Sequence, residues 1–435
     1  MKADHASVEP KRQGQHALGE AARGDSVRAD SALGEDVGGD STPDPSLLQS
    51  EALHAKVRAF ARATLAGSSA EPAQFEELAL EIARFQAQHI PGYARLVESR
   101  GALLERFDSI VAVPTDVFRL ARVAVHAPQH DVARFHTSGT TTTRSGVHYF
   151  RTLKTYSELS LAFGRHALTS AFSGPRVVVA LAPPPSQTPR SSLGYMMSLF
   201  MNKWDGRALN VAPQGAVFDP ESSSRWLAGR GGIDLDGLRR AALLALERQE
   251  PLLVMATSLA LGAMLDGLAG AQIPAPKRTL VMFTGGAKGR AREVKPDDLR
   301  RQVARVFRVP EAHVLGEYGM TELSSQLYEG TIPGGSIGAP VGVYVEPPWL
   351  RVQPVDPATL RAVPRGNIGL AKIIDLGNVD SAVAVLTQDL VRRVEWPEHA
   401  PGGVELIGRR PGSAPRGCSL AFESLVGPST RGGAA

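Results

Sequence analysis

Two short segments of the chain combine residue types that bind anions and metal ions. The first, residues 136–146, reads His-Thr-Ser-Gly-Thr-Thr-Thr-Thr-Arg-Ser-Gly. Its glycines let the backbone approach an anion closely, and its N–H groups, hydroxyls and Arg144 are donors for phosphate oxygens. It lacks the Gly-Lys-Ser/Thr ending of a Walker loop, and a polar surface loop is the alternative interpretation. The expected phosphate contacts are Ser138, Gly139, Thr140, Thr141, Thr142 and Thr143.

The second segment, residues 316–326, reads Gly-Glu-Tyr-Gly-Met-Thr-Glu-Leu-Ser-Ser-Gln. Glu322 is a hard oxygen ligand suited to Mg²⁺, which binds through one or two carboxylates plus phosphates. Thr321 is a donor for a phosphate oxygen, and Tyr318 can stack on or hydrogen-bond to adenine or an acyl carboxylate. An ordinary helix start is the alternative. Together the two segments predict a site that holds ATP and Mg²⁺ while a carboxylate attacks the α-phosphate.

Two smaller features would complete such a site. Residues 284–289, Thr-Gly-Gly-Ala-Lys-Gly, follow a strand-like run, and glycines there let the backbone lie flat against a purine. An ordinary strand-to-helix turn is the alternative. Asp389, in Leu-Thr-Gln-Asp-Leu, can accept both ribose hydroxyls as acidic residues do in nucleotide sites, although a lone Asp is more often a turn cap.

The composition limits the class of protein. With 43% hydrophobic and 21% charged residues, the 435-residue chain reads as soluble and globular. No window of about 18 apolar residues predicts a membrane span, and no secretory signal is visible, so we expect a cytoplasmic location. A single cysteine leaves no internal disulfide framework. The net charge of +4 comes from scattered arginines without a basic, aromatic-interleaved stripe, so nucleic acid is not the expected partner.

The distribution of charged and apolar residues along the chain predicts which secondary-structure elements surround these segments. Residues 1–47 contain five Lys/Arg and nine Asp/Glu, a net charge of −4 against +8 for the rest, and no aromatic residue. Such a segment is expected to be a disordered extension. Apolar residues at helical spacing then predict helices within residues 48–105. The residues that carry this spacing are Leu53, Val57, Phe60, Ala61, Phe75, Leu78, Ile82 and Phe85.

Beyond residue 150 strand-like and helix-like runs alternate, which predicts an α/β sheet with a site at the carboxyl ends of its strands. Expected strands are 176–182, 252–257, 279–283 and 313–315, and expected helices are 153–169, 235–250, 259–269 and 296–307. After residue 335 short strands with many Pro and Gly follow, at 341–345, 350–355, 369–374 and 382–387. We expect an α/β core over 48–335, a β-rich subdomain over 336–408 and a tail over 409–435.

The order of the motifs resembles that of the adenylate-forming enzymes. These motifs are Ser-Gly-Thr-Thr (138–141), Thr-Gly-Gly (284–286), Tyr-Gly-Met-Thr-Glu (318–322), Asp389 and Gly-Arg (408–409). The phosphate loop departs from the superfamily by its four threonines, where a second Gly and then Lys are common. The Gly-Gly turn is also shorter than usual, and both departures bear on nucleotide affinity.

Within the superfamily, residues 316–326 and Arg-Gly-Cys-Ser-Leu at 416–420 look like the acyl-protein synthetase (LuxE) family. The resemblance covers roughly residues 50–425. Members activate a fatty acid as acyl-AMP with ATP and Mg²⁺ and pass the acyl group to a protein thiol for a reductase to convert to aldehyde. The implied fold is α/β, a large adenylate-forming N-terminal domain with a β-rich subdomain, lacking most of the mobile C-terminal domain.

The resemblance also implies roles for individual residues. The phosphates would lie at residues 138–143, the adenine near Gly285 and Gly286, and the ribose at Asp389. The implied nucleotide-binding set further includes Glu317 and Tyr318, with Thr321 as a catalytic residue and Glu322 as the metal ligand.

The tail bears on which cation stabilises the transition state. Typical acyl-CoA synthetases carry a mobile domain after Gly-Arg that supplies a lysine, but here 26 residues follow Arg409 and the last lysine is Lys372. Charge that builds on the α-phosphate oxygens needs a fixed cation. Lys288, Arg144 and Arg409 are the candidates, and Lys288 is favoured because it lies in the expected adenine turn.

The same tail contains Cys418. Thiolates are the attacking form of cysteine and nearby cations lower thiol pKa, and Arg416 is two residues away. A small buried hydrophobe is the alternative that most single cysteines represent. With the resemblance, we expect Cys418 to carry the acyl group.

Two other functions remain open from the sequence. One is a carboxylate activator similar to phenylacetate- or acyl-CoA ligases, with CoA or a carrier protein as the acceptor. The other, from a different class, is a non-catalytic nucleotide-binding protein that regulates a reductase.

Overall fold

A computed structural model describes residues 44–67, 72–137, 145–205, 225–229, 231–285, 295–335, 338–396 and 399–412. Its helices are α1 (Pro45–Leu65), α2 (Pro72–His89), α3 (Pro91–Ser99), α4 (Val117–Leu120), α5 (Lys154–Leu168), α6 (Ser192–Trp204), α7 (Leu235–Glu247), α8 (Ser258–Leu268) and α9 (Pro296–Phe307). Short 3-10 turns are η1 (Phe107–Ser109), η2 (Pro128–His130) and η3 (Glu311–His313).

The strands of the first half are β1 (Val113–Pro114), β2 (Ala133–His136), β3 (Val147–Phe150), β4 (Val177–Leu181), β5 (Ala228–Gly229), β6 (Gly232–Ile233), β7 (Leu252–Thr257) and β8 (Leu280–Thr284). Those of the second half are β9 (Val314–Tyr318), β10 (Leu327–Glu329), β11 (Val343–Val345), β12 (Leu350–Val355), β13 (Ile368–Asp375), β14 (Ala384–Trp396) and β15 (His399–Arg409).

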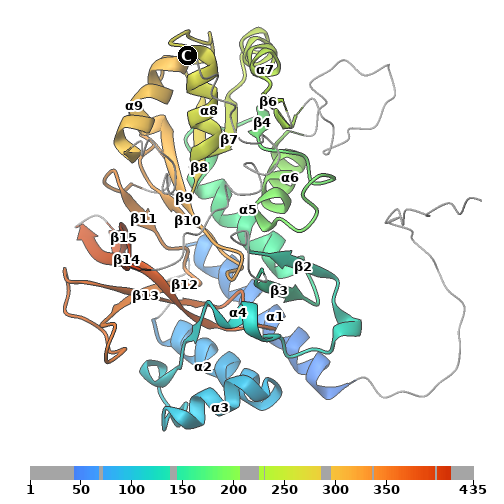
Figure 1. The fold of residues 1–435 in the computed structure, drawn as a ribbon, viewed down its shortest axis with the longest axis vertical. Helices are drawn as coiled ribbons and strands as arrows, with labels where there is room; N and C mark the ends of the chain where they lie inside the picture. The colour runs from blue at the N-terminus through green and yellow to red at the C-terminus, as the bar shows by residue number, and fades with distance from the viewer. Residues whose placement is uncertain are drawn as a thin grey trace, which may run out of the picture. The chain divides into compact units, whose positions relative to one another are not determined.

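One mixed sheet of eleven strands runs through the described part of the chain, in the order β12-β13-β14-β15-β11-β10-β9-β8-β7-β4 with β1 beside β14 (Figure 1). β4, β7, β8 and β9 are parallel, whereas β10 to β15 pair in antiparallel fashion. β10 and β11 join the two regions. The strands expected for the α/β core and those expected for the β-rich subdomain therefore share one sheet.

The parallel strands are buried on both faces because helices cover each side. Along β4, Val178 and Ala180 belong to one hydrophobic cluster together with residues of α5 and α6. Val177, Val179 and Leu181 belong to a second cluster with residues of α7, α8 and α9. Side chains of a strand alternate between its faces, so one continuous apolar run supplies both cores.

Helix α9 shows how local sequence sets an element. Pro296 begins the helix with a fixed φ. The carboxylates of Asp297 and Asp298 in the first turn interact favourably with the positive, N-terminal end of the helix dipole. Leu299 and Val303 are buried in the core, and the residue that follows the helix, Arg308, has a left-handed conformation with φ 54°.

The structure confirms the elements with strong periodicity and corrects two of the predicted strands. Strand 382–387 is in fact β14, which continues to Trp396, and β15 beyond it was not predicted. Polar residues such as Arg392 and Glu405 interrupt the apolar pattern there, but they pair across β14 and β15 at 2.8 Å. Strand 341–345 begins only at Val343, and Val341 is exposed.

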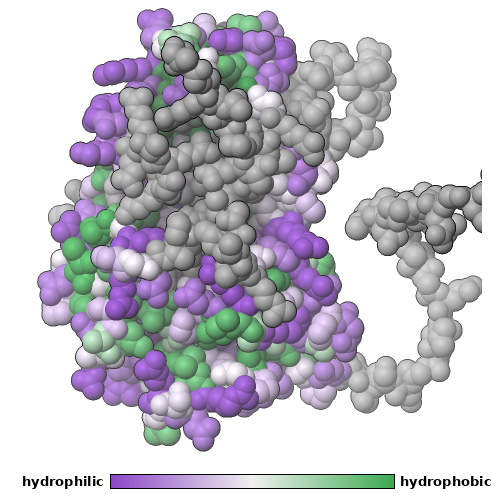
Figure 2. Space-filling view, in the orientation of Figure 1, coloured by the Kyte–Doolittle hydropathy of each residue, from purple (hydrophilic) through white to green (hydrophobic). Residues whose placement is uncertain are grey.

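Among the described residues, no helix is both long enough and apolar enough to cross a membrane. Figure 2 shows hydrophilic residues spread over the described part of the face drawn, with hydrophobic residues scattered among them.

A buried polar cluster ties α1 to α5 and to the loop between β13 and β14. The Asp380 carboxylate accepts hydrogen bonds from Ser50 and from His54 Nε2 (3.0 Å), and Arg151 Nε lies 3.3 Å away. His54 Nδ1 lies 2.9 Å from Thr155 Oγ1. Burial alone would raise the pKa of Asp380, but the hydrogen bond and charge of His54, with Ser50 and Arg151, lower it to about 2.

Asp380→Asn is expected to destabilise the fold near neutral pH by roughly 3 kcal/mol, because it removes one partner of a buried ion pair. The depressed pKa makes part of this contribution pH-dependent. It is complete above the unfolded value of 3.8 and is lost as pH falls towards the folded value of about 2. The measurement is urea unfolding followed by circular dichroism at pH 7 and pH 3.

The difference between wild type and Asp380→Asn should be clearly smaller at pH 3. Asp236→Asn, at an exposed residue paired with Arg239 on the surface of α7, is the matched control and should change little at either pH. An equal difference at both pH values would contradict the role assigned to the charge.

Candidate functional site

The carboxyl ends of β7, β8 and β9 bring two of the predicted motifs side by side. Thr257 is the register partner of Thr284, and Thr284 is the partner of Glu317. Gly285 follows Thr284 with a φ of +84°, a conformation that side-chain-bearing residues rarely adopt. The Thr-Gly turn and the Gly-Glu-Tyr run therefore meet at one edge of the sheet. Gly286 and Lys288 lie outside the described residues.

The segment that contains Thr321 also contacts the stem of the predicted phosphate loop. The Thr321 hydroxyl donates to the His136 carbonyl at 3.4 Å, and His148 Nδ1 donates to the Thr321 carbonyl at 2.8 Å. His136 ends β2 and His148 lies in β3, the two strands that flank the loop. Motifs some 180 residues apart in sequence are thus joined directly. Ser138 to Thr143 themselves, and Arg144, lie outside the described residues.

Hydrogen bonds join the two sides of the loop at its base. Thr137 N donates to the Gly146 carbonyl at 2.9 Å, and Gly146 N donates to Thr137 Oγ1 at 2.8 Å.

Burial lowers the pKa of His148 to about 4, although its bond to Thr321 opposes the shift. His148 is therefore neutral near pH 7, with its proton on the nitrogen that faces Thr321.

Asp389 lies between two other predicted site residues. Tyr318 Oη donates to Asp389 Oδ2 at 2.8 Å, and Arg409 Nε lies 3.1 Å from Oδ1. Asp389 and Arg409 are direct register partners on β14 and β15. Each oxygen of the carboxylate thus contacts one other predicted site residue. The structure brings together Tyr318, Asp389 and Arg409, which lie far apart in the sequence.

Glu317 occupies a buried position at the same edge. Burial raises the pKa of its carboxyl to about 7, although a hydrogen bond from Thr284 lowers it in part. A Cβ at Gly319 would lie 2.4 Å from Glu317 Oε1. The turn after Tyr318 therefore lies directly over this carboxyl group, and a side chain at 319 would require the Glu317 carboxyl group to move.

Glu322, the predicted metal ligand, is buried in the following turn, and its backbone carbonyl accepts a hydrogen bond from Asn378 Nδ2 at 2.9 Å. In the described residues, no group of three or more His, Cys, Asp or Glu side chains is arranged to hold a metal ion by itself. A single carboxylate fits Mg²⁺ only where phosphate oxygens supply further ligands, which is how Mg²⁺ commonly binds beside nucleotides.

Three residues that support this turn were missed by sequence reasoning. Asp375 accepts from Ser324 N (2.9 Å) and Ser325 Oγ (2.7 Å), and Asn378 Oδ1 accepts from Ser324 Oγ at 2.7 Å. Burial raises the pKa of Asp375 to about 6, against these and other hydrogen bonds. His148 is the third. Polar residues after a strand were the available signal at 375–378; for His148 there was none.

The Met and Tyr side chains of helix α6 differ in their surroundings. Met196 and Met197 are 1% and 0% exposed and belong to the main hydrophobic core. Tyr195 instead lies beside Tyr156 and Phe135, with ring centroids 5.6 Å from each. Phe135 directly precedes His136 at the phosphate-loop stem, so an aromatic cluster borders the site. Cys418 lies outside the described residues.

Comparison with known proteins gives partial sequence matches. No protein-family model matches the chain. A long-chain-fatty-acid–luciferin-component ligase of Aliivibrio fischeri is 31% identical over 83 residues, 18% of this chain and 22% of that protein. The protein of the same name from Vibrio harveyi is 23% identical over 160 residues, 36% of this chain and 40% of that protein. Each match spans less than half of the relative's length.

The fold has clear counterparts among solved structures. An open conformation of 2-hydroxyisobutyryl-CoA ligase, in complex with 2-HIB-AMP and CoA, aligns with a TM-score of 0.54 at 13% identity, covering 78% of this chain and 76% of that one. The same ligase in its thioesterification state aligns with a TM-score of 0.52 and covers 84% and 69%. The chain thus has the α/β fold of the large N-terminal domain of adenylate-forming ligases, and parts of its sequence are weakly similar to the two long-chain-fatty-acid–luciferin-component ligases.

Proposed function

We propose that this protein is an ATP-dependent ligase that activates a long-chain fatty acid as acyl-AMP and transfers the acyl group to a protein cysteine. The partial matches to fatty-acid ligases support the substrate class, and the fold supports adenylate formation. The observation that carries the proposal is the contact of Thr321 with His136 and His148, because it holds the metal-ligand turn against the phosphate-loop stem.

In the first half-reaction a carboxylate oxygen of the fatty acid attacks the α-phosphorus of ATP. The bond from that phosphorus to the bridging oxygen breaks, and pyrophosphate leaves with the electron pair. Residues 138–143 would hold the phosphates, Thr321 would donate to a phosphate oxygen, and Lys288 would stabilise charge that develops on the α-phosphate. Arg144 and Arg409 are the alternatives to Lys288.

The remaining residues would position the nucleotide. Asp389 would accept the ribose hydroxyls, while Gly285, Gly286, Glu317 and Tyr318 would line the adenine side. Glu322 would hold Mg²⁺, which when bound neutralises phosphate charge. The Tyr318 hydroxyl and Arg409 already fix the Asp389 carboxylate, so little of its side-chain freedom would remain to be lost on binding.

In the second half-reaction the Cys418 thiolate attacks the acyl carbonyl carbon. The bond from that carbon to the AMP oxygen breaks, AMP leaves, and the thiol proton is released to solvent. The product is a thioester on this chain. A fatty-acid reductase that takes the acyl group onward is the partner that we propose.

The test is pyrophosphate release with ATP, Mg²⁺ and fatty acids of graded length, followed by intact-protein mass spectrometry. We expect acid-dependent release and one acyl mass on the chain. A second candidate, an acyl-CoA ligase, is favoured by the fold shared with a ligase solved in complex with CoA. It would release pyrophosphate and form acyl-CoA without an acyl mass on the chain. No release with any acid would contradict both candidates and favour a regulatory nucleotide-binding protein.

Asp389→Ala is expected to raise the KM for ATP by about tenfold or more and to change kcat little. A hydrogen bond to a charged group contributes about 1.5–3 kcal/mol, and a ribose contact is held in ground and transition states alike. The measurement is steady-state pyrophosphate release at varied ATP.

Tyr318→Phe, which keeps the ring but removes the hydroxyl bonded to Asp389, should raise the KM less than Asp389→Ala does. Asp356→Asn, at a turn between β12 and β13 with no contact to these residues, is the control. A large fall in kcat with the KM unchanged would contradict the ribose assignment.

A further inference from the structure

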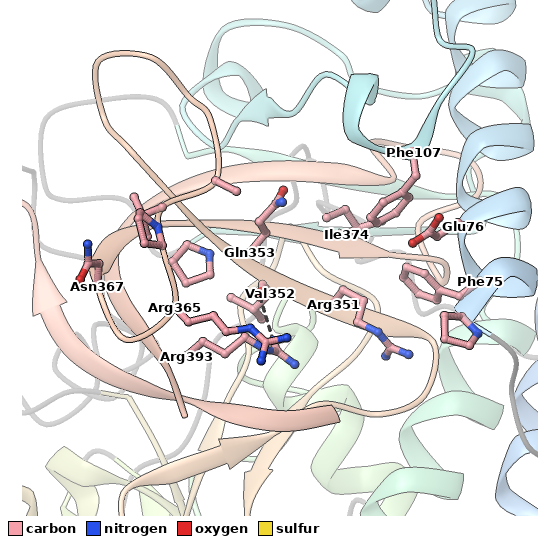
Figure 3. Close-up of a pocket in the computed structure, with 15 residues that line it drawn as sticks. Phe75, Glu76, Phe107, Arg351, Val352, Gln353, Arg365, Asn367, Ile374 and Arg393 are labelled. Carbon is pink, nitrogen blue, oxygen red and sulfur yellow. Dashed lines mark hydrogen bonds between the residues drawn. The ribbon is translucent and has the colours of Figure 1, made fainter. Parts of the chain in front are cut away.

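A separate cavity of about 270 Å³ lies at the other end of the sheet, between the start of α2, η1, strands β12 and β13, and the loop that joins these strands (Figure 3). Its lining contains none of the predicted nucleotide-site residues. Its lining includes Phe75, Phe107, Arg351, Val363, Ile374 and Arg393.

One end of the cavity is apolar. Phe75 and Phe107 pack edge to face, with centroids 5.8 Å apart and planes at 69°, and Ile374 of β13 lies beside them. Phe75 is 2% exposed and Ile374 is 1% exposed, so their positions are fixed by the core behind them. Such a surface favours a short apolar group.

Three arginines line the cavity, and two of them have carboxylate partners. Arg393 bonds both oxygens of Glu346 at 2.8 and 2.9 Å and also the Val352 carbonyl at 3.0 Å. Arg365 pairs with the exposed Glu395 at 2.9 Å. Their charges are therefore largely balanced within the protein.

Arg351 differs from these two. Its Nη1 donates to the carbonyls of Pro348 (3.1 Å) and Leu350 (2.8 Å), and its Cζ lies 4.6 Å from the centre of the Phe75 ring. No ion pair joins it to a carboxylate within the described ranges. Burial lowers the pKa of the half-buried Arg351 guanidinium, and the nearby carboxylates of Glu346 and Glu76 oppose this shift. A half-buried guanidinium that makes no ion pair with the described residues and lies beside an apolar surface can still take a carboxylate as its partner.

We propose that this cavity binds a small monocarboxylate with a short apolar chain, its carboxylate on Arg351 and its chain against Phe75 and Phe107. The planar guanidinium matches the two oxygens of a carboxylate, and because Glu76 also lines the cavity, a monoanion fits it better than a phosphate dianion. The volume is just below the range of about 300–1,000 Å³ typical of small-molecule sites, which favours a small ligand. The site is independent of the proposed catalysis.

The test uses octanoate carrying a terminal diazirine, cross-linked by light to the full chain without ATP and mapped by peptide mass spectrometry. Labelling is expected in peptides that contain Phe75 or Phe107. Excess octanoate should suppress it, whereas octylamine, which has the same chain but a positive charge, should not. Octyl phosphate tests whether the site prefers a carboxylate to a phosphate on the same chain. If it suppresses labelling as strongly as octanoate does, the carboxylate assignment is overturned.

Arg351→Gln should reduce labelling of these peptides by about tenfold or more, as expected for loss of a charged hydrogen-bond donor. Val363→Trp, which fills the cavity and leaves the Arg351 contacts in place, should reduce it as well. Arg361→Gln, in the same loop but outside the lining, is the matched control, and melting temperatures check each fold. Labelling that is confined to other peptides, or equal in Arg351→Gln and Arg361→Gln, would overturn the proposal.

Discussion

Replacing Glu322 by alanine is expected to abolish acid-dependent pyrophosphate release, with a loss of about a hundredfold or more, the scale seen when a group that stabilises developing charge is removed. Glu322 is the carboxylate of the turn held against the phosphate-loop stem through Thr321. Without it, the proposed Mg²⁺ would keep only phosphate and water ligands. The measurement is the release rate at saturating ATP over a wide range of Mg²⁺ concentrations.

Two comparisons make this result specific. Glu322→Gln keeps the size and hydrogen-bonding capacity of the side chain but removes its charge, so it should fail as Glu322→Ala does. Glu311→Ala, at an exposed position of η3, should keep the wild-type rate. Because Glu322 is buried, the melting temperatures of both variants must be measured. Wild-type rates in a folded Glu322→Gln protein would remove the metal-ligand assignment.

The parts of the fold that the sequence predicts well are those that local patterns determine. Strand β7 occupies the predicted residues 252–257, and α9 occupies the predicted residues 296–307. In both, the apolar period and the flanking Pro or Thr residues are sufficient. β15 was missed because its stability depends on pairing with β14 and β11, and its Pro and Gly residues gave no strand pattern.

In the candidate site, too, local motifs predict some of the residues, whereas others are found only from the fold. The motif order predicted that Tyr318, Asp389 and Arg409 serve one site, and the structure brings them into contact. The bond of His148 to Thr321 spans 173 residues and has no local signature. Asp375 lies some 50 residues from the serines that it holds. Such supporting contacts depend on how the sheet closes, so they emerge only from the three-dimensional arrangement.

Contacts within the protein already hold several of the side chains that we propose to bind the nucleotide. Asp389 is held by Tyr318 from β9 and by Arg409 from β15, so strands from both regions of the sheet fix one carboxylate. The turn that contains Glu322 is held by Asn378 and, through its serines, by Asp375. Preorganised groups of this kind lose little side-chain entropy when a ligand binds, which would strengthen binding of the nucleotide.

Cys418→Ser is expected to separate the two half-reactions completely. Adenylation requires the nucleotide, the acid and a cation at the α-phosphate, but no thiol, so pyrophosphate release should stay near the wild-type rate. Thioester formation requires the thiolate, so the hydroxylamine-labile acyl group should disappear. The measurements are pyrophosphate release and the acyl mass on the intact chain, before and after hydroxylamine treatment.

Because Cys418 is the one cysteine of the sequence, chemical modification provides a matched control. N-ethylmaleimide should block acylation of the wild-type protein and leave Cys418→Ser unaffected. Glu322→Ala should instead lose both signals, since it fails before acyl-AMP forms. An acyl group that is retained on Cys418→Ser and remains sensitive to hydroxylamine would show that the acceptor lies elsewhere, and the cysteine would then have a structural role. Loss of pyrophosphate release in Cys418→Ser would contradict the separation, because a residue needed only for transfer cannot control the first step.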